Sequence, residues 1–134
     1  MSETGQRVPF EATTNFRDIG GYRTREGSTV RTGILYRSDG LQSLTPADLE
    51  RYRTLGIQMA YDLRRESEVK RAPNPVPTVG VCMMEAVERA DGARRDRTLL
   101  TSVHDGERMM RDGYVAMVTH SGGVIARIVS DVVS

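Results

Sequence analysis

Three short stretches of this sequence end apolar runs with charged or hydroxyl-bearing side chains, in residues 15–22, 35–38 and 61–64. The first is the densest of the three. It combines an amide, a guanidinium, a carboxylate and the adjacent glycines Gly20 and Gly21. Neither the alternation of a strand nor the periodicity of a helix requires such a set. We therefore expect this stretch to bend the backbone and place polar groups, as support for a site rather than as its centre.

Composition bounds what the chain can be. It has 134 residues, 38% of them hydrophobic, and a net charge of +1. That length is typical of one domain, and that charge excludes a protein that binds nucleic acid through its overall charge. No apolar run approaches the ~18 residues of a transmembrane helix, so we expect no membrane segment. A single cysteine, Cys82, excludes an intrachain disulfide. With no signal sequence at the N-terminus, the chain is predicted to be cytoplasmic.

The N-terminal part is predicted to be β-structure and turns. Residues 1–8 are expected to form a flexible arm. A turn signal separates residues 22–24 from residues 29–31, which predicts a β-hairpin. Residues 33–36 are typical of a short buried strand.

The clearest helix start in the sequence is at Thr45. This residue suits the N-cap, Pro46 suits the first helical position, and Asp48 can bond back to the cap. Apolar residues at helical spacing and Gly56 as a C-cap predict a helix over residues 46–55.

A strand is expected over residues 57–63 directly after this helix, which is the α-then-β half of an α/β unit. The rest of the chain alternates polar and apolar segments. We expect a short helix or turn at 66–71, an extended linker at 73–77, a buried strand at 79–84 and a surface loop at 85–98. Beyond this loop the chain is predicted to be helical, with a last amphipathic helix capped by Ser121.

Five motifs, taken together, resemble one family. They are Asn-Phe-Arg-Asp-Ile-Gly-Gly at 15–21, Leu-Tyr-Arg-Ser at 35–38, Leu-Thr-x-x-Asp at 44–48, Leu-Gly-Ile at 55–57 and Asp-Leu-Arg at 62–64. Residues 15–69 are similar to the N-terminal half of the bacterial-type tyrosine-protein phosphatases, also called tyrosine/serine phosphatases. The resemblance implies an α/β fold, here an incomplete protein-tyrosine-phosphatase-like fold. We expect a sheet flanked by helices, an N-terminal β-hairpin region and one partial phosphatase domain over 9–134.

The resemblance also implies a chemistry. Members of this family hydrolyse phosphoesters, mainly phosphotyrosine, and some have dual specificity. A cysteine thiolate attacks phosphorus, while a Cys-x5-Arg loop binds the phosphate oxygens. A carboxylic acid protonates the leaving oxygen. The expected partner is a phosphotyrosine-containing protein or another phosphoester. No cofactor is implied, and no residue cluster has the spacing of a metal site.

The cysteine loop is not found in this sequence. Cys82 is followed six positions later by Glu88 instead of arginine. We therefore expect Cys82 to be a buried structural thiol. The leading hypothesis is that the chain is a truncated fragment that stops just before the catalytic loop and is inactive as it stands.

Two alternatives stay open. His120 and Ser121, with Arg127 six residues after Ser121, have the spacing of the phosphatase loop with serine in place of cysteine. A serine there could still bind phosphate, so this segment could form a non-catalytic site for phosphate or a partner, as in a pseudophosphatase, and residues 115–118 could be its strand. The other alternative is a fragment without a function of its own.

Candidate site residues follow from the same motifs. Residues expected to support the active site are Arg17, Asp18, Asp62 and Arg64. For Arg17 and Asp18 the competing interpretation is a surface ion pair. The general acid is expected among Asp62, Glu88 and Asp91, and the less favoured phosphate-binding residues are Ser121 and Arg127.

Overall fold

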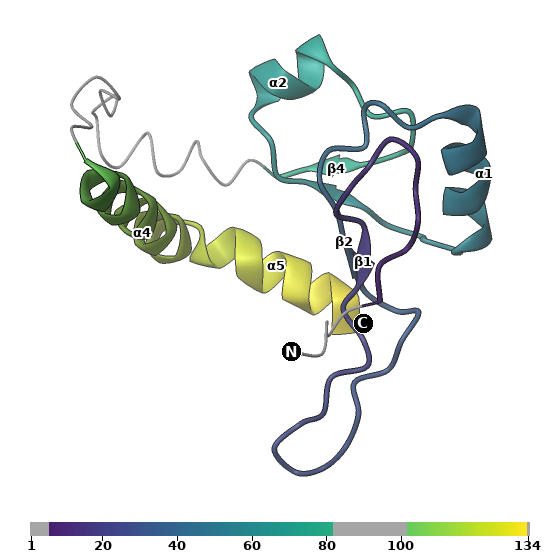
Figure 1. Ribbon diagram of the computed structural model, residues 1–134, viewed down its shortest axis with the longest axis horizontal. Helices are drawn as coiled ribbons and strands as arrows, with labels where there is room; N and C mark the ends of the chain where they lie inside the picture. Colours follow the sequence, from purple (N-terminus) through teal and green to yellow (C-terminus); the bar gives the residue numbers. More distant parts are fainter. Residues whose placement is uncertain (1–5, 82–101, 134) are drawn as a thin grey trace. The chain divides into compact units, whose positions relative to one another are not determined.

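A computed structural model of the chain describes residues 6–81 and 102–133. The chain divides into two compact units. One contains Met1–Ala60 and Ala72–Thr78, and the other contains Tyr61–Arg71 and Val79–Ser134. They are described here one at a time, and their helices and strands are labelled in Figure 1. The described elements are a mixture of two small sheets and several helices, which confirms the predicted α/β class.

The first unit is built on a short antiparallel pair, β1 (Arg17–Asp18) and β2 (Tyr36–Arg37). Residues 6–8 run antiparallel to β1 on its other side. There the Val8 N–H donates to Phe16 O, and the Asp18 N–H donates to Gln6 O, each at 3.0 Å. Residues 6–8 are therefore held to the sheet and do not belong to the flexible arm expected over 1–8.

The hairpin predicted between residues 22–24 and 29–31 is confirmed. Arg23 and Thr29 form a β-bridge, and the Val30 N–H donates to Tyr22 O at 2.9 Å. Gly27 turns the chain at a φ of 84°, a left-handed conformation that favours glycine. In Figure 1 this hairpin extends beyond the β1–β2 pair.

The prediction of a buried strand over 33–36 was wrong. The strand β2 begins only at Tyr36, and Ile34 is 61% exposed. Gly33 explains the late start, because its φ of 77° is incompatible with an extended strand. The chain therefore joins the sheet only after this bend.

Helix α1 (Pro46–Thr54) confirms the predicted helix and its ends. Thr45 and Asp48 form a capping box, in which the Asp48 N–H donates to Thr45 Oγ1 at 3.1 Å and the Thr45 N–H donates to Asp48 Oδ2 at 3.2 Å. Gly56 follows the helix with a φ of 65°, as a glycine after a C-cap does.

A small aromatic core joins α1 to the sheet. The rings of Phe10 and Phe16 stack with their centroids 4.4 Å apart, and the centroids of the Phe16 and Tyr36 rings are 5.7 Å apart. The buried members of the cluster are Phe10, Phe16, Leu44 and Tyr52. Leu49 and Leu55, which share the predicted apolar stripe of α1 with Tyr52, pack against it.

Asp48 does more than cap the helix. Its side chain is buried, and its carboxylate accepts the Glu11 N–H at 2.7 Å and the Ala12 N–H at 3.0 Å. Burial alone would raise the pKa of Asp48. The hydrogen bonds from Glu11, Ala12 and Thr45 outweigh burial and hold the pKa of this carboxyl below its usual value. One aspartate thus fastens the segment before β1 to the start of α1.

The second unit contains a parallel pair, β3 (Tyr61–Asp62) and β4 (Val79–Gly80), with α2 (Glu66–Arg71) between them in the chain. The predicted helix at 66–71 is confirmed. The predicted strand at 57–63 is present only at its last part, because just two of its residues pair with β4. Of the strand expected at 79–84, residues 79–80 pair but are exposed, and residues 82–84 lie outside the described residues, as does the loop expected at 85–98.

The C-terminal part is helical, as predicted, in α4 (Val103–His120) and α5 (Gly122–Val133). They meet at Ser121, which is 1% exposed. Residues 115–118 lie inside α4 and do not form the strand that could have preceded a loop at Ser121. No side chain of α5 is fully buried. The Tyr61 hydroxyl donates a hydrogen bond to Asp131 of α5, which raises the pKa of Tyr61. Among the described helices, none has the length and apolarity needed to cross a bilayer.

The Asp48 contacts predict a pH-dependent loss of stability. Because the folded pKa lies below the ordinary 3.8, the stability that ionised Asp48 contributes is complete above that value and is lost as the pH falls through the folded pKa. We expect Asp48→Asn to be less stable than the parent chain at neutral pH, with a difference that shrinks in acid. Urea midpoints measured by circular dichroism across this pH range test the expectation.

The matched control is Glu50→Gln on the same helix, whose carboxylate pairs only with exposed Arg53 in the described structure. The urea midpoint of Glu50→Gln should equal that of the parent chain at every pH. A difference between Asp48→Asn and the parent chain that stays constant in acid would contradict the role given to the ionised carboxylate.

Candidate functional site

Asp18 is the centre of the conspicuous stretch at residues 15–22. Its side chain is buried, and its two oxygens accept two backbone N–H groups. Oδ1 accepts from Gly20 at 2.7 Å, and Oδ2 accepts from Gly33 at 2.6 Å. The carboxylate therefore ties the chain after β1 to the bend that precedes β2.

Gly20 is required because the backbone of residues 31–32 passes against it. A Cβ at this position would overlap the Arg31 carbonyl oxygen and lie 2.5 Å from Thr32 Cα. Gly21 has a different reason, since its φ of 87° is left-handed. The paired glycines of the motif thus allow a close backbone crossing and the turn beside it.

Arg17 and Asp18 bond to different partners. The Arg17 Nε–H donates to Asn15 Oδ1 at 3.0 Å, while Asp18 bonds to the two glycines. Because neighbouring residues of a strand point to opposite faces, the half-buried Arg17 and the buried Asp18 are separated by the sheet. Their geometry is that of a structural support and not of a surface ion pair.

Asp39, which the sequence did not single out, fixes the start of the same stretch. Its carboxylate accepts the Thr14 N–H at 3.2 Å and the Asn15 N–H at 3.4 Å. The small burial of the group would raise its pKa, but these bonds and one from the Ser38 hydroxyl lower it. The Ser-Asp pair after β2 was a signal for such a role, because both side chains readily bond to nearby backbone.

Tyr36 lies opposite Asp18 in the β1–β2 pair. Burial raises the pKa of the Tyr36 hydroxyl, and the negative charge of Asp18 raises it further. Tyr36 therefore stays a neutral phenol beside the carboxylate and packs its ring on Phe16.

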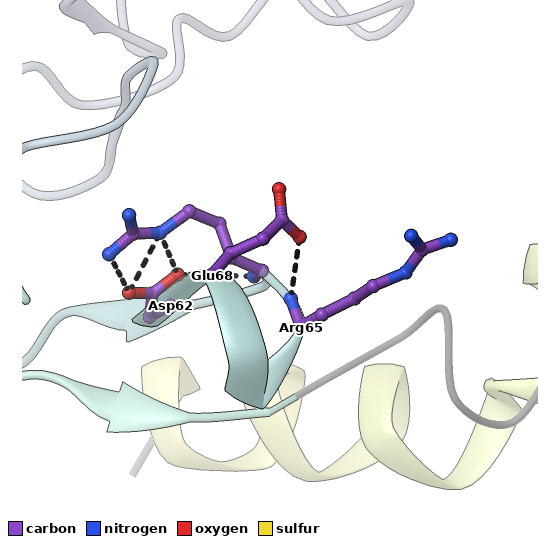
Figure 2. A network of polar contacts seen from close by, with 4 residues as sticks. Asp62, Arg65 and Glu68 are labelled. Carbon is purple, nitrogen blue, oxygen red and sulfur yellow. Dashed lines mark hydrogen bonds and ion pairs between the residues drawn. The ribbon is translucent and has the colours of Figure 1, made fainter. Parts of the chain in front are cut away.

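Asp62 and Arg64 form the second candidate cluster, at the end of β3. Figure 2 shows the carboxylate of Asp62 with the hydrogen bonds that it accepts drawn as dashed lines. Arg64 Nε–H donates to Oδ1 at 3.0 Å, and its NH2 group donates to Oδ2 at 2.7 Å. The Arg64 backbone N–H also donates to Oδ1, at 3.1 Å. The hydrogen bonds that the Arg64 guanidinium donates to Asp62 raise the pKa of Arg64, although its partial burial acts in the opposite direction.

The start of α2 directly follows this pair. The Arg65 N–H donates to Glu68 Oε2 at 3.0 Å, a side chain-to-backbone bond of the kind that caps a helix (Figure 2). The sequence placed Asp62 and Arg64 at the carboxyl end of a strand, where α/β proteins build sites, and both do lie there. That the two side chains pair with each other through two hydrogen bonds could be seen only in the structure.

The other candidates are elsewhere. Ser121 lies at the junction of α4 and α5, and Arg127 lies within α5. Arg127 Nε is 3.9 Å from Asp131 Oδ2. Three further predicted residues lie outside the described part of the chain: Cys82, Glu88 and Asp91. Within the described part, no group of three His, Cys, Asp or Glu side chains could hold a metal ion.

The Asp18 bridge predicts a large stability loss on its removal. We expect Asp18→Ala to lower the free energy of unfolding by about 3 kcal/mol, because two backbone donors lose a charged acceptor. Urea titration by circular dichroism measures the change. Glu26→Ala in the exposed hairpin turn is the control, with an expected change within about 0.5 kcal/mol. Equal midpoints for Asp18→Ala and the parent chain would show that the bridge adds no stability.

Known proteins with similar sequences connect these clusters to one family. A family model described as the tyrosine phosphatase family matches residues 8–134. Over 61 residues the chain is 44% identical to a protein of Cupriavidus necator that is named "Putative tyrosine-protein phosphatase". This alignment covers 46% of the chain but only 22% of that relative. Since the family model spans nearly the whole sequence, this chain belongs to the tyrosine phosphatase family.

Proposed function

We propose that this chain provides the supporting part of a phosphatase that hydrolyses phosphoesters, with phosphotyrosine in a protein as the main substrate. Phosphoserine and phosphothreonine are further substrates if the enzyme has dual specificity. The observation that carries the proposal is the family match over residues 8–134, a range that contains the Asp18 bridge and the Asp62–Arg64 pair. A cytoplasmic location stays a prediction from the sequence.

The proposed reaction needs a nucleophile that these 134 residues do not contain. In a cysteine-dependent phosphatase a thiolate attacks phosphorus, a Cys-x5-Arg loop holds the phosphate oxygens, and a cysteinyl-phosphate forms before water releases phosphate. The one cysteine of this sequence, Cys82, has Glu88 at the position where the loop needs arginine. We therefore propose that the 134-residue chain is inactive and that a longer chain carrying such a loop is active.

Asp62 and Arg64 have a positioning role in this proposal. Both oxygens of Asp62 accept N–H groups of Arg64, so the carboxylate holds the guanidinium in one orientation. That orientation leaves Arg64 at the end of a strand, a place from which it can steady a phosphate-binding loop or attract an anionic substrate. A carboxylate that accepts from a guanidinium at both oxygens suits this role better than proton donation. Of the three general-acid candidates, we therefore favour Glu88 and Asp91 over Asp62.

Turnover of an aryl phosphate tests the main proposal. We expect no release of p-nitrophenol from p-nitrophenyl phosphate by the 134-residue chain, because no thiolate is present in a phosphate-binding loop. A chain extended through a Cys-x5-Arg loop should release it, and Cys→Ser in that loop should abolish the release.

Two outcomes would change the assignment. Turnover by the 134-residue chain that Cys82→Ser removes would overturn the proposed inactivity. Saturable phosphate binding that Arg127→Ala abolishes would instead favour the non-catalytic alternative at His120, Ser121 and Arg127. A chain that neither binds phosphate nor becomes active when extended would agree with a fragment without function.

The role of Arg64 is tested in the active, longer chain. We expect Arg64→Lys to lower kcat/KM by about ten- to a hundred-fold, because an ammonium cannot form the bidentate pair with Asp62 that fixes the position of the charge. Arg65→Lys, at the neighbouring exposed position, is the matched control and should leave kcat/KM within about two-fold. Equal effects of the two substitutions would rule out a special role of the Asp62–Arg64 pair.

A further inference from the structure

Three arginines lie side by side across the first sheet. Arg17 of β1 is directly opposite Arg37 of β2, and on its other side it is bridged to Arg7. Residues that are directly opposite in antiparallel strands carry their side chains on the same face of the sheet. We call Arg7, Arg17 and Arg37 the arginine row.

The side chains of the row start close together. The bonds of Val8 and Asp18 to the facing strand make Arg7 and Arg17 a non-hydrogen-bonded pair, the type in which Cα atoms are only ~4.5 Å apart. Arg17 and Arg37 have the wider spacing of ~5.5 Å. Like charges directly opposite each other destabilise a sheet, so this row carries a cost when no anion is present.

The row faces away from the buried side of the sheet. Phe16 and Asp18, on either side of Arg17, are buried, while Arg17 is half-buried and Arg7 and Arg37 are exposed. A ligand in solution can therefore reach all three guanidinium groups. Arg17 uses its Nε–H for Asn15, and its terminal nitrogens have no hydrogen bond among the described residues.

The described carboxylates of the same unit do not neutralise the row. Asp18, Asp39 and Asp48 each bind backbone N–H groups. Glu11 accepts from the Thr45 hydroxyl, and Glu50 pairs with Arg53. In the part of the chain that the structure describes, no carboxylate forms an ion pair with Arg7, Arg17 or Arg37. The acidic side chain that follows β2 most closely, Asp39, is directed to Thr14, Asn15 and Ser38.

We propose that the arginine row is a binding site for a phosphate group of a phosphorylated ligand. Guanidinium groups bind phosphate through paired N–H donors, and a phosphate at neutral pH carries more charge and more acceptor oxygens than a carboxylate. Three guanidiniums in line match a dianion or a diphosphate. The site lies on residues outside any Cys-x5-Arg loop, so it does not depend on the proposed phosphatase activity.

Binding of inorganic pyrophosphate to the 134-residue chain tests the site. Isothermal titration calorimetry at about 0.1 M salt should show saturable binding near a Kd of about 1 mM, and thermal unfolding should shift upward with pyrophosphate. Citrate, a carboxylate anion of similar charge, should bind more weakly. Free phosphotyrosine is the second arm: tighter binding than pyrophosphate indicates a phosphoprotein ligand, and the reverse indicates a small polyphosphate.

Arg37→Gln is the decisive variant, because Arg37 is exposed and has no side-chain partner among the described residues. It should weaken pyrophosphate binding about ten-fold and leave the ligand-free Tm equal or raised, since it relieves repulsion in the row. Arg7→Gln should act in the same way. Arg53→Gln on α1 removes the same charge outside the row and is the matched control.

Three results would overturn the proposal. The first is pyrophosphate affinity unchanged in Arg37→Gln, and the second is an equal loss in Arg53→Gln, which would indicate a general charge effect. The third is an absence of saturable binding to the parent chain while its circular dichroism shows a folded protein. None of these results bears on turnover by a longer chain, so the phosphatase proposal is tested separately.

Discussion

Carboxylates that accept backbone N–H groups hold the first unit together, and two of them, Asp18 and Asp48, are buried. Asp18 joins Gly20 to Gly33, Asp39 fixes Thr14 and Asn15, and Asp48 holds Glu11 and Ala12 against the start of α1. The hydrophobic cluster beside them has few buried members, so it cannot by itself order the long loops. A buried N–H without an acceptor costs about 1–3 kcal/mol, and the aspartates supply acceptors that the two-residue strands leave missing.

This use of aspartate determines the charge of the surface. Asp18, Asp39 and Asp48 accept backbone N–H groups, and none of them forms an ion pair with an arginine of the row among the described residues. The arginines of the β1–β2 ladder consequently face solvent without carboxylate partners among the described residues. The backbone bonds that Asp18 makes on the buried face thus leave the arginine row on the other face, where we propose that phosphate binds.

What the sequence could predict was local. The capping box of Thr45 and Asp48, the glycine after α1, the turn of the hairpin and helix α2 each depend on residues a few positions apart, and all were confirmed. The position of β2 and the lengths of β3 and β4 were not predictable in this way. The start of β2 depends on where Gly33 bends the chain, and the lengths of β3 and β4 depend on which residues of distant segments pair. Neither can be predicted from the alternation of residue types along the chain.

The candidate site shows the same limit. Arg17, Asp18, Asp62 and Arg64 were identified from motifs, but their partners were not. A motif records residue types along the chain, whereas the bond from Gly33 to Asp18 and the register of Arg7 against Arg17 join separate segments. In both clusters the charged residues bind the backbone or each other. Groups engaged in this way fix the shape of the chain around them, so the hydrolysis that we propose needs a nucleophile from outside these motifs.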